Sequence, residues 1–377
     1  MKTETHLYLR RLTINSRWEK YVSGERRFQG IPGIEQDRRG HLWATWYGGG
    51  QGEGPENFVV LVVSEDNGIT WSEPVAVVDP PGKIRAFDPC LWRDPTGKLW
   101  WFWAESYSEK EGEIFDGRGG VWATVFSHEE PEALSFSQPR KIANGVMLNK
   151  PIVLSTGEWL LPTAVWEYWP VKDESLARER FSNATISQDG GVSFQRRGGA
   201  DVAERCFDEH MFIELKNGRL WCLVRTLYGI GQSFSSDRGY TWSGGEDSGL
   251  GGPNSRFFIR RLRSGNILLI NHADISPQEA LKLYREGKKW RPRSHLTAFL
   301  SLNDGLTWQG GLLLDERVGV SYPDGTEIED GSIYIIYDRD RSGAGEILLS
   351  GFREEDVLEG KLVSPGAFLK RVVSRLR

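Results

Sequence analysis

The 377-residue chain contains few of the residues that mark several common classes of protein. It has three cysteines, Cys90, Cys206 and Cys222, and this odd, widely spaced set does not suggest a disulfide framework. No HExxH, paired CxxC or GxSxG motif occurs, so the sequence supports neither a zinc site nor a serine hydrolase. We therefore expect the protein to use no metal and no organic cofactor.

The chain also lacks a strong excess of one charge and a long apolar run. Its formal net charge is −5, with both signs scattered along the sequence, so no basic stripe offers itself to nucleic acid. No apolar run approaches the length of a membrane span, and the N-terminal MKTETHLYLRRL has no apolar signal segment. We expect a soluble, cytoplasmic protein, although a trimmed secreted form would look the same.

A short pattern returns four times in the sequence. The copies are SEDNGITW (Ser64–Trp71), SQDGGVSF (Ser187–Phe194), SSDRGYTW (Ser235–Trp242) and SLNDGLTW (Ser301–Trp308). The Asp or Asn can accept backbone N–H groups inside a turn, the glycine tolerates a positive φ, and Thr-Trp opens a strand. Each copy therefore predicts a structural hairpin, and the repetition indicates an array of small units such as propeller blades.

A second repeat fixes the number of units. A turn glycine followed by an aromatic and β-branched run recurs six times, at Gly40, Gly97, Gly157, Gly218, Gly265 and Gly331. These units predict an all-β fold: one six-bladed β-propeller of four-stranded antiparallel blades over residues 1–377. We expect the N-terminal HLYLRRL to complete the last blade, and a helical insertion at 276–287 that begins at Ser276 and Pro277.

The same periodicity predicts which side chains meet at the mouth of the central axis. Nine residues before each hairpin glycine stand Ile31, Asp88, Leu148, Glu209, Arg256 and Tyr322. Four of the six are polar or ionisable, and such groups are costly to bury unless they are paired or used. Lys150 lies close to Leu148, and Asp208 and His210 flank Glu209. A ring that only satisfies itself with salt bridges and water is the alternative.

Tyr322 and Glu209 form the most informative pair. A carboxylate within hydrogen-bond reach of a phenol can take its proton and make the oxygen nucleophilic. A lone tyrosine at a strand start more often packs, so the interpretation depends on the spacing. The hypothesis is an activated tyrosine nucleophile.

Three further segments, with the four boxes, make the chain resemble the sialidase (neuraminidase) superfamily of BNR or Asp-box propellers. DEHMFIELKNGRLWCLVR resembles the stretch in which a Glu, here Glu209, precedes a substrate-binding Arg, here Arg225, by sixteen residues. RSHLTAFLSLNDGLTW resembles the segment with another such Arg, here Arg293. SYPDGTEIEDGSIYIIYD resembles the segment of the nucleophile, here Tyr322. Sialidases use tyrosine because the substrate carboxylate would repel an attacking carboxylate.

The chain departs from the family pattern in two places. Sialidases carry Phe-Arg-Ile-Pro, whose Arg completes the clamp on the substrate carboxylate, whereas this chain reads FQGIP with Gly30. Arg256, Lys150 or Arg85 could supply the missing cation. The general acid of the family also has no evident counterpart, and Glu53 and Glu56 in a glycine-rich loop are the available carboxyls, with Glu53 slightly preferred.

Two other groups of residues have a structural and a functional interpretation. The run DRDR at 338–341 predicts a salt-bridged strand end, with a lesser chance that one Arg contacts ligand. Most of the sixteen Trp residues predict blade packing, while a sugar-stacking wall could draw on four aromatic residues, Trp46, Tyr47, Trp166 and Trp169.

The resemblance and the residues together predict an exo-acting, retaining glycoside hydrolase that releases a terminal acidic sugar of the sialic type from a glycan or glycoside. Asp88, Arg85 and His210 are further candidates for substrate contact. One alternative is a polysaccharide lyase acting on uronic acids, with Tyr322 and His210 or His272 as acid and base. The other alternative is a carbohydrate-binding propeller without catalysis. The sequence predicts neither the particular sugar nor the oligomeric state.

Overall fold

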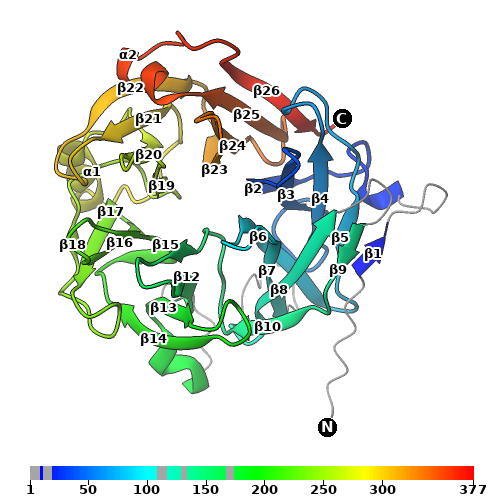
Figure 1. Cartoon of the computed structure of the whole chain (residues 1–377), viewed down its shortest axis with the longest axis horizontal. Coiled ribbons are helices and arrows are strands. Elements are labelled where there is room, and N and C mark those ends of the chain that lie inside the picture. Colours follow the sequence, from blue (N-terminus) through cyan, green and yellow to red (C-terminus); the bar gives the residue numbers. More distant parts are fainter. Residues whose placement is uncertain (1–8, 12–18, 108–116, 129–133, 167–173) are drawn as a thin grey trace.

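The computed structural model describes residues 9–11, 19–107, 117–128, 134–166 and 174–377. Six antiparallel sheets follow one another around a central axis, as Figure 1 shows in a view along that axis. The prediction of a six-bladed all-β propeller is confirmed. In the part of the chain that is described, no helix has the length and apolar character needed to cross a bilayer.

The first three blades contain these strands, from the axis outward or in chain order. Blade one has β2 (Gln29–Gln36), β3 (Leu42–Gly48), β4 (Phe58–Ser64) and β5 (Ala76–Val78); blade two has β6 (Ile84–Arg93), β7 (Leu99–Tyr107), β8 (Gly120–His128), β9 (Leu134–Phe136) and β10 (Arg140–Ala143); blade three has β11 (Ile152–Val153), β12 (Trp159–Ala164), β13 (Ser182–Ser187) and β14 (Gln195–Ala200).

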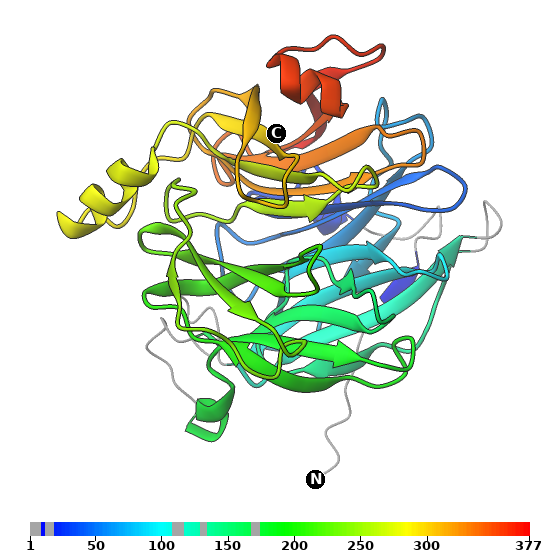
Figure 2. The ribbon, with the colours of Figure 1, turned by 60° about the vertical axis from the view of Figure 1, so that its left-hand side comes forward.

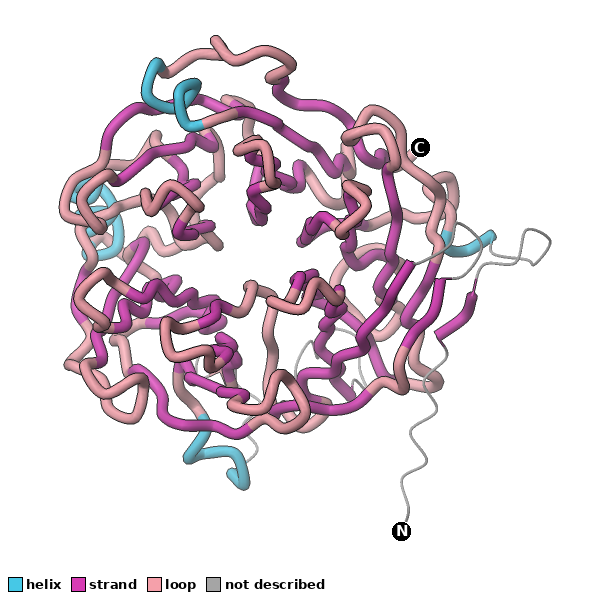
Figure 3. Tube along the Cα trace, in the orientation of Figure 1, coloured by secondary structure: helices cyan, strands magenta, loops and turns pink. Residues whose placement is uncertain are grey.

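The other three blades repeat the plan. Blade four has β15 (Arg205–Glu214), β16 (Leu220–Thr226), β17 (Gly229–Ser235) and β18 (Glu246–Asp247); blade five has β19 (Phe258–Arg261), β20 (Ile267–His272), β21 (Leu296–Ser301) and β22 (Gln309–Asp315); blade six has β23 (Val320–Glu327), β24 (Ile333–Arg339), β25 (Glu346–Phe352) and β26 (Phe368–Arg375). Figure 3 shows how strands dominate the chain and how loops and turns join them.

The N-terminal strand does not lie where the sequence predicts. β1 (Leu9–Arg11) pairs antiparallel with β5 and so adds a fifth strand to blade one, whereas blade six is completed by its own C-terminal β26. The prediction that the N-terminal run completes the last blade is therefore wrong. Contacts between β2 and blade six close the ring: the N–H of Gln29 donates to the carbonyl of Arg341, and the N–H of Ile31 to the Asp338 carboxylate.

Helices are few and peripheral. α1 (Pro277–Arg285) starts after Ser276, whose side chain accepts a hydrogen bond from the N–H of Glu279, and it lies in the range where the sequence predicts a helix. It projects from the outside of the ring, as Figure 2 shows. The remaining helical segments are α2 (Glu354–Glu359) and two 3₁₀ turns, η1 (Glu19–Tyr21) and η2 (Glu174–Glu179).

The four repeated boxes share one hairpin geometry. In the first copy the Ser64 hydroxyl accepts the N–H of Gly68 at 2.8 Å and donates to the Asp66 carboxylate at 2.8 Å. Asp66 in turn accepts the N–H of Thr70, and Gly68 has a φ of 77°. The corresponding Ser–Gly bonds in the other three copies also measure 2.8 Å. The boxes are turn devices at the blade edges, remote from the axis.

Candidate active site

An irregularity in the innermost strands creates the site. In β2, β6, β15 and β23 the pairing with the next strand shifts register near the start of the strand. At these bulges Ile31, Asp88, Asp208 and Tyr322 adopt positive φ values of 57°, 47°, 47° and 53°. Bulges re-aim side chains, and non-glycine residues in this left-handed region are held there by their surroundings. Four blades thus turn side chains toward one mouth of the axis.

Those side chains line a cavity of about 200 Å³, which we call the tyrosine pocket. Its walls come from every blade, and the residues are Ile31, Tyr47, Glu53, Arg85, Phe87, Asp88, Trp166, Phe207, Glu209, Arg225, Trp290, Arg293, Tyr322 and Arg341. Four arginines face three carboxyls in this set. The pocket therefore suits an anionic ligand that also presents apolar surface.

Tyr322 and Glu209 meet in the pocket, although 113 residues separate them. The Tyr322 hydroxyl donates to Glu209 Oε1 at 2.6 Å. Arg225 Nη1 lies 2.8 Å from both Glu209 Oε1 and the Tyr322 oxygen and donates to each. The Arg225 Nε donates to Asn254 at 2.6 Å, which fixes the guanidinium from behind. Glu209 Oε2 has no hydrogen-bond partner among the described residues.

Burial and charge set the protonation of the phenol. Desolvation raises the pKa of Tyr322, and the Glu209 carboxylate raises it further, while Arg225, Arg293 and Arg341 oppose the rise. The phenol is therefore neutral at physiological pH and needs a base to become nucleophilic. Glu209 is the group in contact with it.

Two more arginines lie against the Tyr322 ring. The Arg341 guanidinium carbon is 4.2 Å from the ring centroid and that of Arg293 is 5.3 Å away. Arg293 donates to the carbonyl of Asn254 at 3.2 Å, and burial with the nearby Arg225 charge lowers its pKa. Arg85 stacks over Phe87 at 4.0 Å on the opposite wall. These cations surround the phenol on several sides.

The carboxyls of the pocket differ in their surroundings. Burial, with the charges of Glu209 and Glu53, raises the pKa of Asp88 to about 7, and no described residue donates a hydrogen bond to it. Glu53 lies in the loop after β3 and forms an ion pair with Arg341 at 3.2 Å. Glu56 is exposed and does not line the pocket. Asp88, expected only as a substrate contact, has the environment of an acid.

The aromatic wall differs in part from the expected one. Tyr47 and Trp166 line the pocket, whereas Trp46 is buried elsewhere with Arg26 over its ring. Trp169 lies outside the described residues. Phe207 and Trp290 complete the wall, and the Trp290 ring remains 54% exposed at the rim.

The structure does not bring Arg256 and Lys150 into the tyrosine pocket. Both are buried deeper along the axis in a group that we call the axial cluster, which consists of Glu35, Lys150, Arg256 and Asp324. Lys150 lies 3.3 Å from both Glu35 and Asp324, and Arg256 lies 3.4 Å from Asp324. Backbone carbonyls of Ile34, Leu91 and Leu148 accept their remaining donors. Neither cation is the missing arm of a clamp at the pocket.

The two candidate histidines are also elsewhere. The ring nitrogens of His210 contact the carbonyls of Asp208 and Asn183, and burial lowers its pKa to about 4. His272 contacts the carbonyl of Ser294 and is likewise buried. Neither lines the tyrosine pocket. Their positions give no support to an acid–base role beside Tyr322.

Sequence reasoning missed Arg341, Phe207 and Trp290 as pocket residues. Arg341 belongs to the DRDR run, and its Nε does form the expected salt bridge with Asp338 at 2.9 Å. The same side chain also reaches the pocket, because it follows β24 at the mouth of the axis. Trp290 comes from the segment after α1, whose path has no signature in the sequence. The described residues contain no group of three or more potential metal ligands.

Comparisons with known proteins agree with this architecture. Residues 40–335 match the model of the BNR repeat-like domain family. No curated protein sequence matches the chain.

Among solved structures, a protein of unknown function from Dyadobacter fermentans is similar with a TM-score of 0.64 and 17% identity, over 88% of this chain and 95% of that one. A Hadza microbial sialidase also gives a TM-score of 0.64 at 17% identity, over 89% and 67%. A leech intramolecular trans-sialidase gives 0.63 at 13% identity, over 92% and 71%. At such identities the likeness concerns the fold, and the family match covers most of the chain. The chain belongs to the BNR repeat-like domain family and has the six-bladed propeller fold found in sialidases.

Proposed function

We propose that the protein is a retaining glycoside hydrolase that releases a terminal acidic sugar of the sialic acid type. The observation that carries the proposal is the Tyr322–Glu209 hydrogen bond of 2.6 Å inside a pocket lined by four arginines. A neutral nucleophile in a cationic pocket fits a substrate with a carboxylate at the reacting carbon, since a carboxylate nucleophile would be repelled by it.

In the first step the Tyr322 oxygen attacks the anomeric carbon and Glu209 takes the phenol proton. Arg225 donates to both partners and stabilises the negative charge that develops on the phenolic oxygen. The bond to the leaving oxygen breaks as the sugar becomes attached to Tyr322. In the second step water attacks the anomeric carbon, and Glu209 returns the proton to the phenol.

Asp88 is the group we assign to protonate the leaving oxygen, in preference to Glu53. A pKa of about 7 leaves it protonated in the acid range and able to act as a base afterwards, when it takes the proton of the incoming water. Glu53 is already engaged in an ion pair with Arg341. Arg225 and Arg293 are the cations we assign to the substrate carboxylate.

The test is turnover of a panel of acidic and neutral glycosides by the wild type and by Glu209→Gln. We expect release of an acidic sugar by the wild type and a rate lower by roughly 10²- to 10⁴-fold in the variant, because the general base is lost. Mass spectrometry with a fluorinated sialosyl fluoride should find the covalent adduct on the peptide that carries Tyr322. Turnover of neutral glycosides alone would reject the proposal.

The same assay separates the alternatives. A lyase would produce an unsaturated sugar with ultraviolet absorbance, and a binding propeller would retain ligand without turning over any substrate. No contact in the described residues favours the lyase, because neither His210 nor His272 lines the tyrosine pocket.

A further inference from the structure

Gly30 and Arg341 are complementary in space although they lie at opposite ends of the chain. A Cβ atom on Gly30 would lie 2.6 Å from Cδ of Arg341 and 2.8 Å from its Cγ. Real Cβ atoms do not approach other atoms so closely, so the Arg341 side chain fills the space that any larger residue at position 30 would need. The absence of a side chain at position 30 thus admits an arginine from blade six.

The rest of the Arg341 side chain is held with one nitrogen uncommitted. Asp338 accepts from its Nε at 2.9 Å, Glu53 pairs with its Nη1 at 3.2 Å, and the guanidinium lies over the Tyr322 ring. Nη2 is buried and has no hydrogen-bond partner among the described residues. Because a buried guanidinium N–H without an acceptor is costly, this nitrogen is available to an anionic ligand.

We propose that Arg341 holds the carboxylate of the substrate in place of the arginine that FQGIP lacks. This inference rests on the proposed function and adds a specificity-determining residue to it. The anion then binds Arg225 and Arg293 on one side and Arg341 on the other, around Tyr322. Position 30 must remain small for as long as Arg341 has this role.

The test is a reciprocal exchange. Arg341→Ala should raise KM for an acidic glycoside, and Kd for an unreactive sialic acid glycal, by roughly ten- to a hundredfold. Arg341→Lys should restore little, because an ammonium has no fork for a carboxylate. The control is Arg339→Ala: this arginine is on the same strand but pairs with Glu346, and its loss should leave both constants unchanged.

The double variant Gly30→Arg/Arg341→Ala should recover much of the lost affinity, whereas Gly30→Arg alone should be impaired by the clash. A merely structural Arg341 would give no such rescue. Unchanged Kd in Arg341→Ala, or absence of rescue in the double variant, would overturn the inference while leaving the proposed hydrolase intact. Glycal binding that depends on Arg341, without turnover of any glycoside, would overturn the function and keep the inference.

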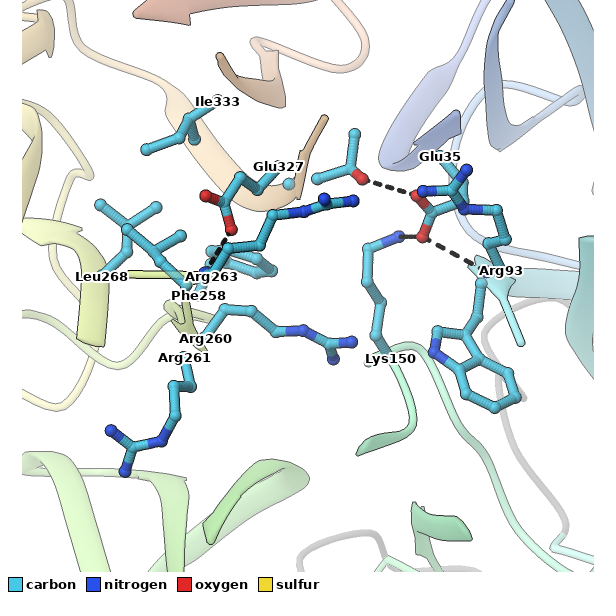
Figure 4. A pocket seen from close by; sticks show the side chains of 14 residues that line it. Glu35, Arg93, Lys150, Phe258, Arg260, Arg261, Arg263, Leu268, Glu327 and Ile333 are labelled. Carbon is cyan, nitrogen blue, oxygen red and sulfur yellow. Dashed lines mark hydrogen bonds and ion pairs between the residues drawn. The ribbon is translucent and has the colours of Figure 1, made fainter. Parts of the chain in front are cut away.

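A second, independent feature is the cavity at the opposite ends of the innermost strands, shown in Figure 4, which we call the arginine pocket. It measures about 370 Å³ and is lined by the ends of β2, β6, β19 and β23. Arg93, Arg260 and Arg263 are among its residues, and no ion pair joins any of them to a carboxylate in the described chain.

The acidic groups of this pocket are already occupied. Glu35 accepts from Thr326, Gln36 and Lys150, and Glu327 accepts the N–H of Arg263. The Arg260 guanidinium donates only to the carbonyl of Pro151, at 2.7 Å, and burial lowers its pKa. Figure 4 shows the cationic ends of Lys150, Arg260 and Arg263 directed into the same space. The arginine pocket therefore has an excess of positive charge that the protein does not neutralise.

We infer that the arginine pocket binds a small oxoanion, a phosphate or a carboxylate group, through Arg93 and Arg260. Calorimetric titration with inorganic phosphate and with citrate distinguishes the two chemistries. We expect at least one of them to bind, and the affinity to fall at least tenfold in Arg93→Gln/Arg260→Gln. Arg225→Gln controls for binding in the tyrosine pocket and should not alter this event.

Three results would overturn the second inference. These are absence of binding at millimolar anion, an affinity that the Arg93→Gln/Arg260→Gln exchange does not change, or loss of binding in Arg225→Gln. Arg93→Gln alone is a second variant in case the buried Arg260 is needed for folding.

Discussion

The tyrosine pocket and the axial cluster contain similar residues and differ in how their charges are satisfied. In the axial cluster, Lys150 has two carboxylates at 3.3 Å and backbone carbonyls for its other donors. In the tyrosine pocket, Arg341 Nη2 and Glu209 Oε2 lack partners among the described residues, and Asp88 accepts no hydrogen bond there. Charges that are fully paired contribute structure, whereas charges held with unused donors are available to a ligand.

The largest effect that would test this comparison is at the nucleophile. Tyr322→Phe should reduce turnover by roughly 10³-fold or more, because no oxygen remains to attack the anomeric carbon. Tyr337→Phe is the matched control, since Tyr337 is also buried but donates to Asp315 on the far side of β24. Steady-state rates and far-ultraviolet circular dichroism measure the two effects. Comparable losses in both variants would contradict the assignment.

The axial cluster should respond in stability. Asp324→Ala should lower the free energy of unfolding by about 3–5 kcal/mol, because it leaves Lys150 and Arg256 short of a buried counter-charge. Asp330→Ala removes an exposed partner of Arg353 and should cost at most about 1 kcal/mol. Urea unfolding measures both. A small effect of Asp324→Ala would show that the two clusters do not differ as we describe.

Asp88→Asn should change the pH dependence. With a pKa raised to about 7, Asp88 protonates the leaving group below that pH, so wild-type kcat/KM should fall as pH rises through 7. The variant should lose this dependence, and it should lose more activity on a natural glycoside than on an aryl glycoside with a good leaving group. An unchanged pH profile would return the acid role to Glu53.

The same substitution has a predicted sign for stability. The folded protein holds the Asp88 proton more tightly than the unfolded chain does, so stability from this group is lost as pH rises from about 4 to about 7. Asp88→Asn should therefore be more stable than wild type at pH 8 and nearly equal to it near pH 4. Thermal unfolding at the two pH values tests this.

The smallest effect is expected at a repeated box. Ser64→Ala removes the acceptor of the Gly68 N–H and should cost about 1 kcal/mol without altering kcat or KM. Chemical unfolding and the standard activity assay test the two parts of this prediction. A change in activity would mean that the boxes do more than shape the blade edges.

The sequence predicts the blade count because turn glycines and boxes repeat with fixed local chemistry. It also predicts the meeting of Tyr322, Glu209, Arg225 and Arg293, which the structure brings into one pocket. Position along a strand was sufficient where the strand carries a bulge, as at Asp88 and Tyr322. It failed at Leu148 and Arg256, which occupy equivalent positions and do not line the pocket.

The remaining differences arise from contacts between distant segments. No local pattern shows that Gly30 leaves room for Arg341, because the two meet only when the ring closes. The pairing of β1 with β5 has the same origin, since an outer edge strand can add to any blade with an open edge. The raised pKa of Asp88 depends on burial and on Glu209 and Glu53, which come from other blades.

The register shifts of the innermost strands have a consequence for engineering. Each shift turns one residue toward the ligand while the rest of its strand keeps the pairing that holds the blade. Ile31 occupies such a position and carries no polar group. Replacing it with asparagine or glutamine would introduce a hydrogen-bonding group beside the nucleophile without altering the sheet, so this position is a natural starting point for diversifying the range of sugars accepted.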